Sequence, residues 1–239
     1  ALLSLIKRKE KIVAMIAPSF VVDFNYPEII GMLKRIGFLC VAEVSRGAIE
    51  TNKQLLALMK LHPDKRYITS PCPTVVRTIR NRHPELVQYL AQIDSPMSAT
   101  AKILAKEYPG YKKIHICPCL IKKFEATEDY PELDILSVTF QELAKVFEIL
   151  KIKPEEKDKD AIFIVEGKET RLYPISGGLA QSAGITQNLT DEQYDVISGP
   201  ALVEEFLKKF PNMSELKVVD ILNCEGGCIN GPGIISKES

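Results

Sequence analysis

The sequence predicts an α/β protein with two lobes, each built on a mostly parallel sheet of about four strands flanked by helices. Short runs of apolar and β-branched residues alternate along the chain with longer segments that have helical periodicity. Such alternation is typical of parallel sheets whose two faces are covered by helices. At 239 residues and 46% hydrophobic content, the chain is long enough for two lobes with substantial cores.

The first half of the chain is expected to form one lobe, over residues 1–127. Buried strands are predicted at residues 12–20, 38–44, 66–70 and 113–117. The segments between them have apolar residues at helical spacing, and Pro73 and Pro96 suit the first turn of a helix. The helices predicted on these grounds are residues 26–36, 52–61, 73–79, 84–92 and 96–108.

The second half is expected to form the other lobe, over residues 128–239. Its predicted strands are residues 134–138, 195–198 and 218–223, and a hairpin outside the sheet is predicted from residues 161–165 and 170–173. Thr139 and Glu142 form a capping-box pattern that opens a helix through residue 150. Further helices are predicted at residues 179–186 and 201–210. Ligands of such sheets bind beyond the carboxyl ends of strands, so a cofactor is expected in the cleft between the lobes.

Charge and hydrophobicity exclude several classes of partner. Lys+Arg and Asp+Glu are equal at 31 each, so no overall field favours nucleic acid or an anionic membrane. No apolar run approaches the ~18–20 residues that span a bilayer. Basic residues follow the first apolar ones, which is the wrong order for a signal peptide. We therefore expect a cytoplasmic protein, and the missing initiator Met suggests a piece of a longer chain.

Three cysteine-containing segments each close an apolar run that is expected to be a strand. Because strand ends meet at one edge of a parallel sheet, we expect their sulfurs to gather around one site. Glycines in the last segment allow the main chain to pass close to a bulky cofactor. The segments are Thr69-Ser70-Pro71-Cys72-Pro73, Cys117-Pro118-Cys119, and Cys224-Glu225-Gly226-Gly227-Cys228.

Six cysteines without a signal sequence favour metal or redox chemistry in a reducing compartment over a disulfide framework. Zinc held by four thiolates is an alternative. Structural zinc sites usually come from two closely spaced cysteine pairs, whereas Cys72, Cys119 and Cys224 lie far apart in the sequence. A site assembled from distant segments needs a preformed fold, which favours a buried cofactor. Cys40, inside an apolar strand, is interpreted as a core residue, and His115 as a strand residue rather than a ligand.

In order and relative spacing, the three segments resemble the signature motifs of the [FeFe]-hydrogenase catalytic domain. Those motifs are Thr-Ser-Cys-Cys-Pro, Met-Pro-Cys-x-x-Lys-x-x-Glu, and a Cys-x-x-x-Cys followed by glycines. The resemblance covers nearly the whole chain. It implies a [4Fe–4S] cluster linked through one cysteine to a di-iron subsite that carries CO, cyanide and a dithiolate.

The resemblance also implies roles for single residues. Cys72, Cys119, Cys224 and Cys228 match the cluster ligands, and Cys228 matches the one that bridges to the di-iron subsite. Lys122 matches a lysine that hydrogen-bonds a cyanide, and an ammonium beside a bound anion is physically reasonable. The remaining matches are Ser95 in the site wall, Glu125 of the second motif, the glycine pair Gly177 and Gly178 near the cluster, and Gly227 in the third motif.

The chain departs from the family pattern at several of these places. Pro71 stands where the active enzymes have a cysteine that relays protons, and a proline side chain can carry no proton. Cys117 and Leu222 replace two methionines that pack against the di-iron subsite, and Met97 stands where glutamine is usual. Strand alternation places Cys117 on the same face as Cys119, so Cys117 is a candidate substitute proton carrier. These departures resemble divergent branches of the family that are regarded as sensors.

The resemblance therefore implies an [FeFe]-hydrogenase-like oxidoreductase that handles 2 H⁺ + 2 e⁻ ⇌ H₂ slowly, or a hydrogen sensor. The expected partners are ferredoxin or a fused iron–sulfur domain as electron donor or acceptor, hydrogenase maturation proteins, and a signalling domain in a longer chain. The alternative is a relative that holds iron–sulfur clusters for assembly or structure without the di-iron subsite. Lys122 and Ser95, which serve the di-iron ligands in the family, favour the first reading.

Overall fold

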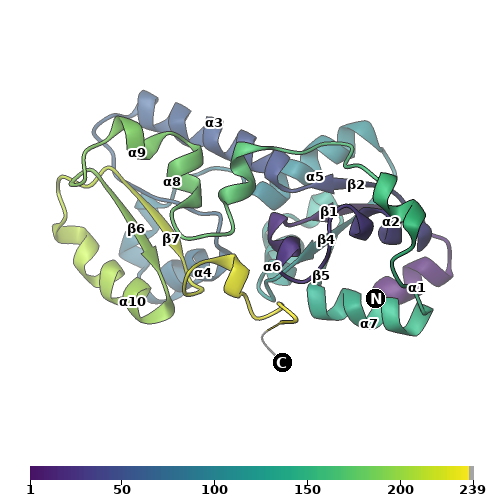
Figure 1. Cartoon of the computed structure of the whole chain (residues 1–239). Helices are drawn as coiled ribbons and strands as arrows, with labels where there is room; N and C mark the ends of the chain where they lie inside the picture. Colours follow the sequence, from purple (N-terminus) through teal and green to yellow (C-terminus); the bar gives the residue numbers. More distant parts are fainter. Residues whose placement is uncertain (237–239) are drawn as a thin grey trace.

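Two parallel sheets form the core of the molecule, in agreement with the predicted fold class (Figure 1). The computed structural model describes residues 1–236. Every pairing between the named strands is parallel. The first sheet has the order β2 (Phe38–Glu43), β1 (Ile12–Ile16), β4 (Lys112–Cys117) and β5 (Ile135–Thr139). The second has the order β3 (Tyr67–Ile68), β7 (Val218–Leu222) and β6 (Tyr194–Ser198).

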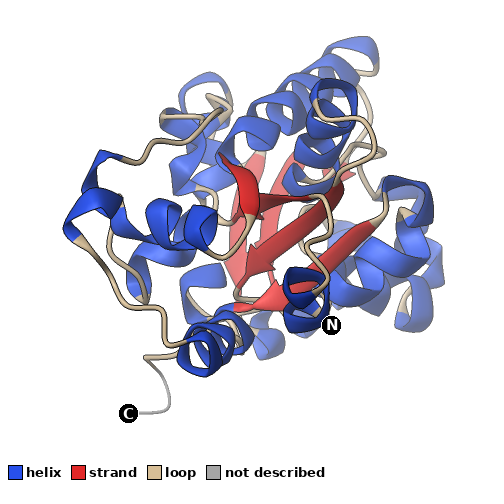
Figure 2. Cartoon of the chain, turned by 90° about the vertical axis from the view of Figure 1, so that its right-hand side faces the viewer, coloured by secondary structure: helices blue, strands red, loops and turns tan. Residues whose placement is uncertain are grey.

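Helices cover both faces of the first sheet, as Figure 2 shows. The longest helix in the described part of the chain has 17 residues, and no helix there is both long and apolar enough to cross a bilayer. The helices are α1 (Leu2–Lys7), α2 (Glu28–Arg35), α3 (Ser45–Leu61), α4 (Pro73–Arg82), α5 (Pro96–Glu107), α6 (Lys122–Phe124), α7 (Phe140–Leu150), α8 (Gly178–Ser182), α9 (Ile185–Asn188) and α10 (Pro200–Lys209).

The two lobes are not the two halves of the chain. β5, expected in the second lobe, pairs with β4 at the edge of the first sheet. β3, expected in the first lobe, pairs with β7 of the second sheet. The division near residue 127 is therefore wrong for both strands. Strand periodicity predicts where a strand lies, but its partner is chosen by tertiary packing.

The hairpin predicted from residues 161–165 and 170–173 is also wrong. Residues 164 and 165 run beside β2 through two hydrogen bonds, from Ile164 N–H to Val41 O at 3.0 Å and from Glu43 N–H to Val165 O at 2.9 Å. Residues 169–172 instead form a turn of 3₁₀ helix. Phe163 of this segment packs into the core whereas Ile162 is exposed, and a β-branched pattern alone cannot distinguish this packing from strand pairing.

Several element boundaries differ from the prediction for local reasons. β1 stops at Ile16 because Pro18 has no N–H for the ladder, and a 3₁₀ helix (Pro18–Val22) follows. α3 begins at Ser45, seven residues before its predicted start, because its first turns are buried through small and polar residues. The predicted helix at 179–186 breaks at Gly184, whose φ is +71°. Residues 84–89 form 3₁₀ rather than α-helix.

Strand alternation in β1 divides the core of the first lobe between the two faces of its sheet. Ile12, Ala14 and Ile16 pack with α2 and α7 on one face, whereas Val13 and Met15 pack with α5 on the other. These five side chains are at most 1% exposed. Fully burying a large apolar side chain contributes roughly 1.5–3 kcal/mol, so the strands are a rigid support for the loops at their ends.

The capping box at the start of α7 connects this support to the second cysteine motif. Thr139 Oγ1 accepts a hydrogen bond from Glu142 N–H at 3.1 Å, and Glu142 Oε2 accepts one from Thr139 N–H at 2.8 Å. Glu142 also pairs with Lys123 at 2.5 Å, just after the second motif. Thr139 lies opposite Cys117 in the sheet, so the cap fixes the end of β5 beside that motif.

We predict that Thr139→Ala lowers the free energy of unfolding by about 1 kcal/mol, because it removes the acceptor for the first turn of α7. Urea unfolding of the metal-free protein measures this loss. Thr127→Ala is the matched control, since the exposed Thr127 hydroxyl bonds only to the backbone of its own helical turn. Equal losses in the two variants would contradict the role of the cap.

Candidate functional site

Two neighbouring cavities lie where strands of both sheets end, and one wall is common to them. The first, which we call the thiol cavity, is lined by Cys72, Cys119, Cys224 and Cys228. The second, which we call the apolar cavity, has a volume of about 90 Å³ and mostly apolar walls that follow β1, β4 and β7. The common wall consists of Pro71, Pro118, Cys119, Lys122, Leu222 and Cys228.

Each thiol reaches its cavity because its segment leaves a buried strand. Cys72 follows β3 and is the N-cap of α4, with Pro73 in the first helical position. Its sulfur thus lies at a helix N-terminus, where free N–H groups and the helix dipole favour an anionic group. Cys119 follows β4 by two residues, and Cys224 follows β7 by two. The structure thus places the four cysteines predicted as cluster ligands on one cavity.

The chemistry of the four thiols fits a metal cluster. Burial, followed by the other three thiols, raises the pKa of Cys228 well above its ordinary value. Burial and then Cys72 raise the pKa of Cys119. Thiols that disfavour one another's ionisation are stabilised as thiolates when they bind a cation. No three His, Cys, Asp or Glu side chains in residues 1–236 are grouped to hold a single metal ion. Four thiols spread around a cavity suit a cluster better than one zinc ion.

The glycines of the third motif allow close approach between backbone segments, and Gly231 also lines the thiol cavity. A Cβ on Gly231 would lie 2.6 Å from Pro118 O, and one on Gly227 would lie 2.3 Å from Pro174 O. Gly233 N–H donates to Pro118 O at 2.8 Å, which joins the third motif to the second. Neither cavity is lined by Gly177, Gly178 or Gly227, and their cofactor contacts stay a prediction. Gly178 instead packs against the backbone, where a Cβ would meet Leu172 O.

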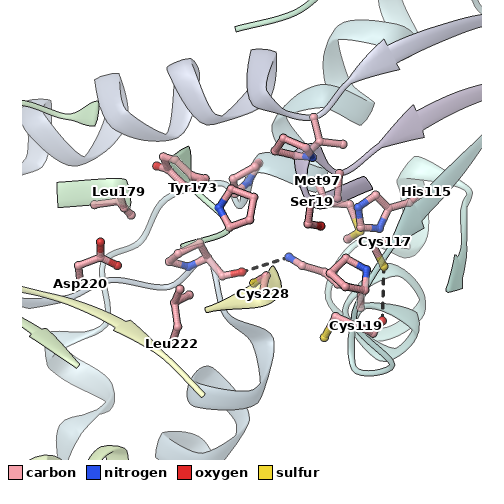
Figure 3. Close-up of a pocket in the computed structure, with 18 residues that line it drawn as sticks. Ser19, Met97, His115, Cys117, Cys119, Tyr173, Leu179, Asp220, Leu222 and Cys228 are labelled. Atoms are coloured by element: carbon pink, nitrogen blue, oxygen red, sulfur yellow. Dashed lines mark hydrogen bonds between the residues drawn. The ribbon is translucent and has the colours of Figure 1, made fainter. Parts of the chain in front are cut away.

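The apolar cavity is lined by the predicted wall residues Pro71, Met97, Cys117 and Leu222 (Figure 3). It is also lined by residues that motif reasoning missed: Ala17, Pro18 and Ser19 after β1, His115 on β4, Tyr173 and Leu179 before and in α8, and Asp220 on β7. Two of these missed residues could have been predicted from strand alternation. His115 shares a face with Cys117, and Asp220 shares one with Leu222.

Lys122 stands in the common wall with its charge buried and paired. Its Nζ donates to Pro71 O at 3.1 Å and lies 2.6 Å from Glu125 Oε2. Burial lowers the pKa of Lys122, but Glu125 and the nearby thiols together raise it above its ordinary value, so the ammonium stays charged. Ser95, the N-cap of α5, donates its hydroxyl to Glu125 Oε1. Ser95 and Glu125 thus line neither cavity and lie behind Lys122.

The thiol of Cys117 lies in the apolar cavity but bonds within its own loop. Its Sγ donates to Cys119 O at 3.4 Å, a contact drawn in Figure 3. Burial, followed by the neighbouring Cys119, raises the pKa of Cys117 far above its ordinary value. The thiol thus contacts the Cys119 backbone, and burial disfavours the loss of its proton. The proton relay stays a prediction.

The family follows from this fold and site. Residues 10–232 match the family described as iron only hydrogenase large subunit, C-terminal domain, and the chain belongs to this family. The resemblance inferred from the cysteine motifs is thereby confirmed.

Among individual proteins, the chain is 24% identical over 252 residues to iron hydrogenase 1 of Clostridium pasteurianum, covering 84% of this chain and 44% of that protein. It is 26% identical over 187 residues to the cytosolic Fe-S cluster assembly factor NAR1 of Encephalitozoon cuniculi, covering 70% and 51%. The solved structure of [FeFe]-hydrogenase HydA1 from Chlamydomonas reinhardtii has a TM-score of 0.72 at 17% identity, covering 94% of this chain and 80% of that chain. The chain thus spans about half, or less, of the length of these two curated relatives.

We predict that Asp220 makes stability fall as the pH rises. Its buried carboxylate accepts a hydrogen bond from Ala180 N–H at 3.0 Å, yet burial raises the pKa of Asp220 from 3.8 to about 6. The folded protein thus holds this proton more tightly than the unfolded chain. Its contribution to the free energy of unfolding is complete below the unfolded pKa and falls by about 3 kcal/mol as the pH rises through the folded value.

Urea unfolding of the metal-free protein and of Asp220→Asn, from about pH 4.5 to 7.5, measures this contribution. As the pH rises, the unsubstituted protein is expected to lose stability relative to Asp220→Asn. Asp191→Asn, at an exposed turn, is the control for loss of one negative charge. A pH-independent difference for Asp220→Asn would exclude a buried, proton-holding carboxyl.

Proposed function

We propose that this chain is an [FeFe]-hydrogenase-like iron–sulfur protein that handles 2 H⁺ + 2 e⁻ ⇌ H₂ slowly. Cys72, Cys119, Cys224 and Cys228 would hold a [4Fe–4S] cluster in the thiol cavity. A di-iron subsite with CO, cyanide and dithiolate ligands would occupy the apolar cavity, with Cys228 in the wall between them. The observation that carries the proposal is that four thiols line one cavity and that two of them, Cys119 and Cys228, also line a second cavity with apolar walls.

The cluster would exchange electrons, and the di-iron subsite would supply the centre at which H₂ forms or splits. Lys122 has three N–H donors, of which one bonds Pro71 O and one faces Glu125. The remaining donor is available to an anionic ligand in the cavity, where a charge-assisted bond is strong. Glu125 and Ser95 hold the ammonium in place from behind. The apolar walls exclude water, which strengthens that electrostatic contact.

Proton delivery is the step for which this chain is poorly equipped. Pro71 lines both cavities with a side chain that carries no exchangeable proton. The resemblance places the acidic pair of the family's usual proton route near Thr51 and Gln54. These residues are not acids and instead hydrogen-bond Asp94 in the loop before Ser95. Slow turnover fits a hydrogen sensor within a longer signalling protein as well as a weak enzyme.

The expected partners belong to the same proposal. A cytoplasmic ferredoxin or a fused iron–sulfur domain would exchange electrons with the cluster, and maturation proteins would deliver the di-iron subsite. The second candidate function is that of an assembly or structural iron–sulfur protein, which holds the cluster without the di-iron subsite. The likeness to NAR1 and the proline at position 71 favour this candidate.

We predict CO and cyanide infrared bands after maturation of the anaerobically purified protein, together with a brown iron–sulfur chromophore. Cys228→Ala should lose the infrared bands, because Cys228 stands between the cavities, and should weaken the chromophore. Cys40→Ala, in the apolar core, should keep both. An active [FeFe]-hydrogenase, matured in parallel, controls for delivery. A chromophore without infrared bands would favour the assembly-type function.

We further predict that Pro71→Cys raises the rate of H₂ evolution in the matured protein by ~10²–10⁴-fold, the usual contribution of a positioned proton donor. The Lys122 bond should survive, because it uses the backbone oxygen at position 71. Pro71→Ala is the control, since it removes the ring without adding a proton. Equal rates for the Cys and Ala variants, with unchanged infrared bands, would place the slow step elsewhere.

A further inference from the structure

His115 has no part in the proposed function, yet its ring lines the apolar cavity. It lies on β4, two residues before Cys117, and both side chains are seen at the same end of the cavity in Figure 3. The residue is 2% exposed. A polar ring that faces a cavity with apolar walls needs a partner for each nitrogen, since an unsatisfied buried polar atom costs about 1–3 kcal/mol.

One nitrogen of the ring is accounted for by Ser137, on the neighbouring strand β5. His115 Nδ1 lies 3.3 Å from Ser137 Oγ, and the same hydroxyl lies 3.2 Å from Lys122 O. A carbonyl oxygen only accepts, and a hydroxyl has one proton to donate. Both contacts are satisfied together only if Ser137 donates to Lys122 O and accepts from His115 Nδ1–H. Ser137 thus sets the tautomer with its proton on Nδ1.

The other nitrogen, Nε2, then presents a lone pair. It has no hydrogen-bond partner among residues 1–236. Burial and the Lys122 ammonium lower the pKa of His115 to about 3, so the imidazole is neutral at physiological pH and is a weak proton carrier. A neutral imidazole whose Nδ1–H is anchored by an acceptor, with Nε2 free, is the arrangement found in metal-ligating histidines.

We propose that His115 Nε2 is a nitrogen ligand to the iron centre that occupies the apolar cavity. The inference rests on the proposed function only in placing a metal centre there. No three protein donors in the described part of the chain converge on a single ion, so the centre must arrive with ligands of its own and gain one from His115. His115 lies on β4, as the sequence predicted, and the proposal adds a ligand role to that position.

The structure also gives Ser137 a double role in this arrangement. Its hydroxyl fixes the His115 tautomer and anchors the backbone of Lys122, the cation in the common wall. The His115 ring and the backbone of Lys122 are thereby both held by the Ser137 hydroxyl. Ser137 is a positioning residue, and its loss should alter the nitrogen contact without removing the donor atom.

The test is pulsed EPR of iron-loaded, reduced protein, with and without ¹⁵N-histidine labelling, after iron and sulfide reconstitution and maturation. A nitrogen coupling that changes with the label is expected, and it should disappear in His115→Gln while the cluster signal remains. His83→Gln, whose ring bonds Glu204 away from both cavities, is the matched control and should keep the coupling. Ser137→Ala should shift the coupling but retain it.

Infrared bands measured on the same samples separate this inference from the proposed function. Nitrogen coupling without CO and cyanide bands supports the histidine ligand and removes the di-iron function. Bands without nitrogen coupling overturn the ligand and leave the function in place. A coupling that persists in His115→Gln, or that is absent from protein shown by iron analysis to be loaded, also overturns the inference.

Discussion

The buried ammonium of Lys122 is a charged contact that joins the two sheets at their functional ends. Its bond to Pro71 O connects the segment after β3, in the second sheet, to the segment after β4, in the first. A buried charge is tolerated only when it is paired, and Glu125 supplies the partner with the Ser95 hydroxyl behind it. Both cavities include Lys122 in their walls, so their shape depends on this one cation remaining in place.

Much of the fold could be predicted because its signals are local. Strand and helix periodicity located all seven strands of residues 1–236, and the capping box gave the start of α7. The membership of the sheets could not be predicted, because β3 has only two residues and its partner β7 lies near the end of the chain. Register and partner depend on which apolar faces meet, and this information is distributed over the whole sequence.

The residues of the site also fall into those that the sequence predicted and those that it did not. The cysteines and Lys122 were found because their chemistry is unusual and their spacing forms motifs. His115 and Asp220 were not, because a polar residue within an apolar strand has the same local pattern whether it faces a core or a cavity. The glycines of the third motif have a role that the sequence did not predict. At Gly231 and Gly227 a Cβ would meet the backbone of other segments.

The pairing of β3 with β7 also has a consequence for biosynthesis. On the ribosome, the first sheet has all its strands once Thr139 has emerged, whereas β3 must wait for Val218 before it gains a neighbouring strand. Contacts so distant in sequence form slowly. The last two thiols, Cys224 and Cys228, follow that strand directly. A site that needs all four thiols can therefore form only after Cys228 has emerged, and a nascent chain stalled before β7 would expose Cys72 without Cys224 and Cys228.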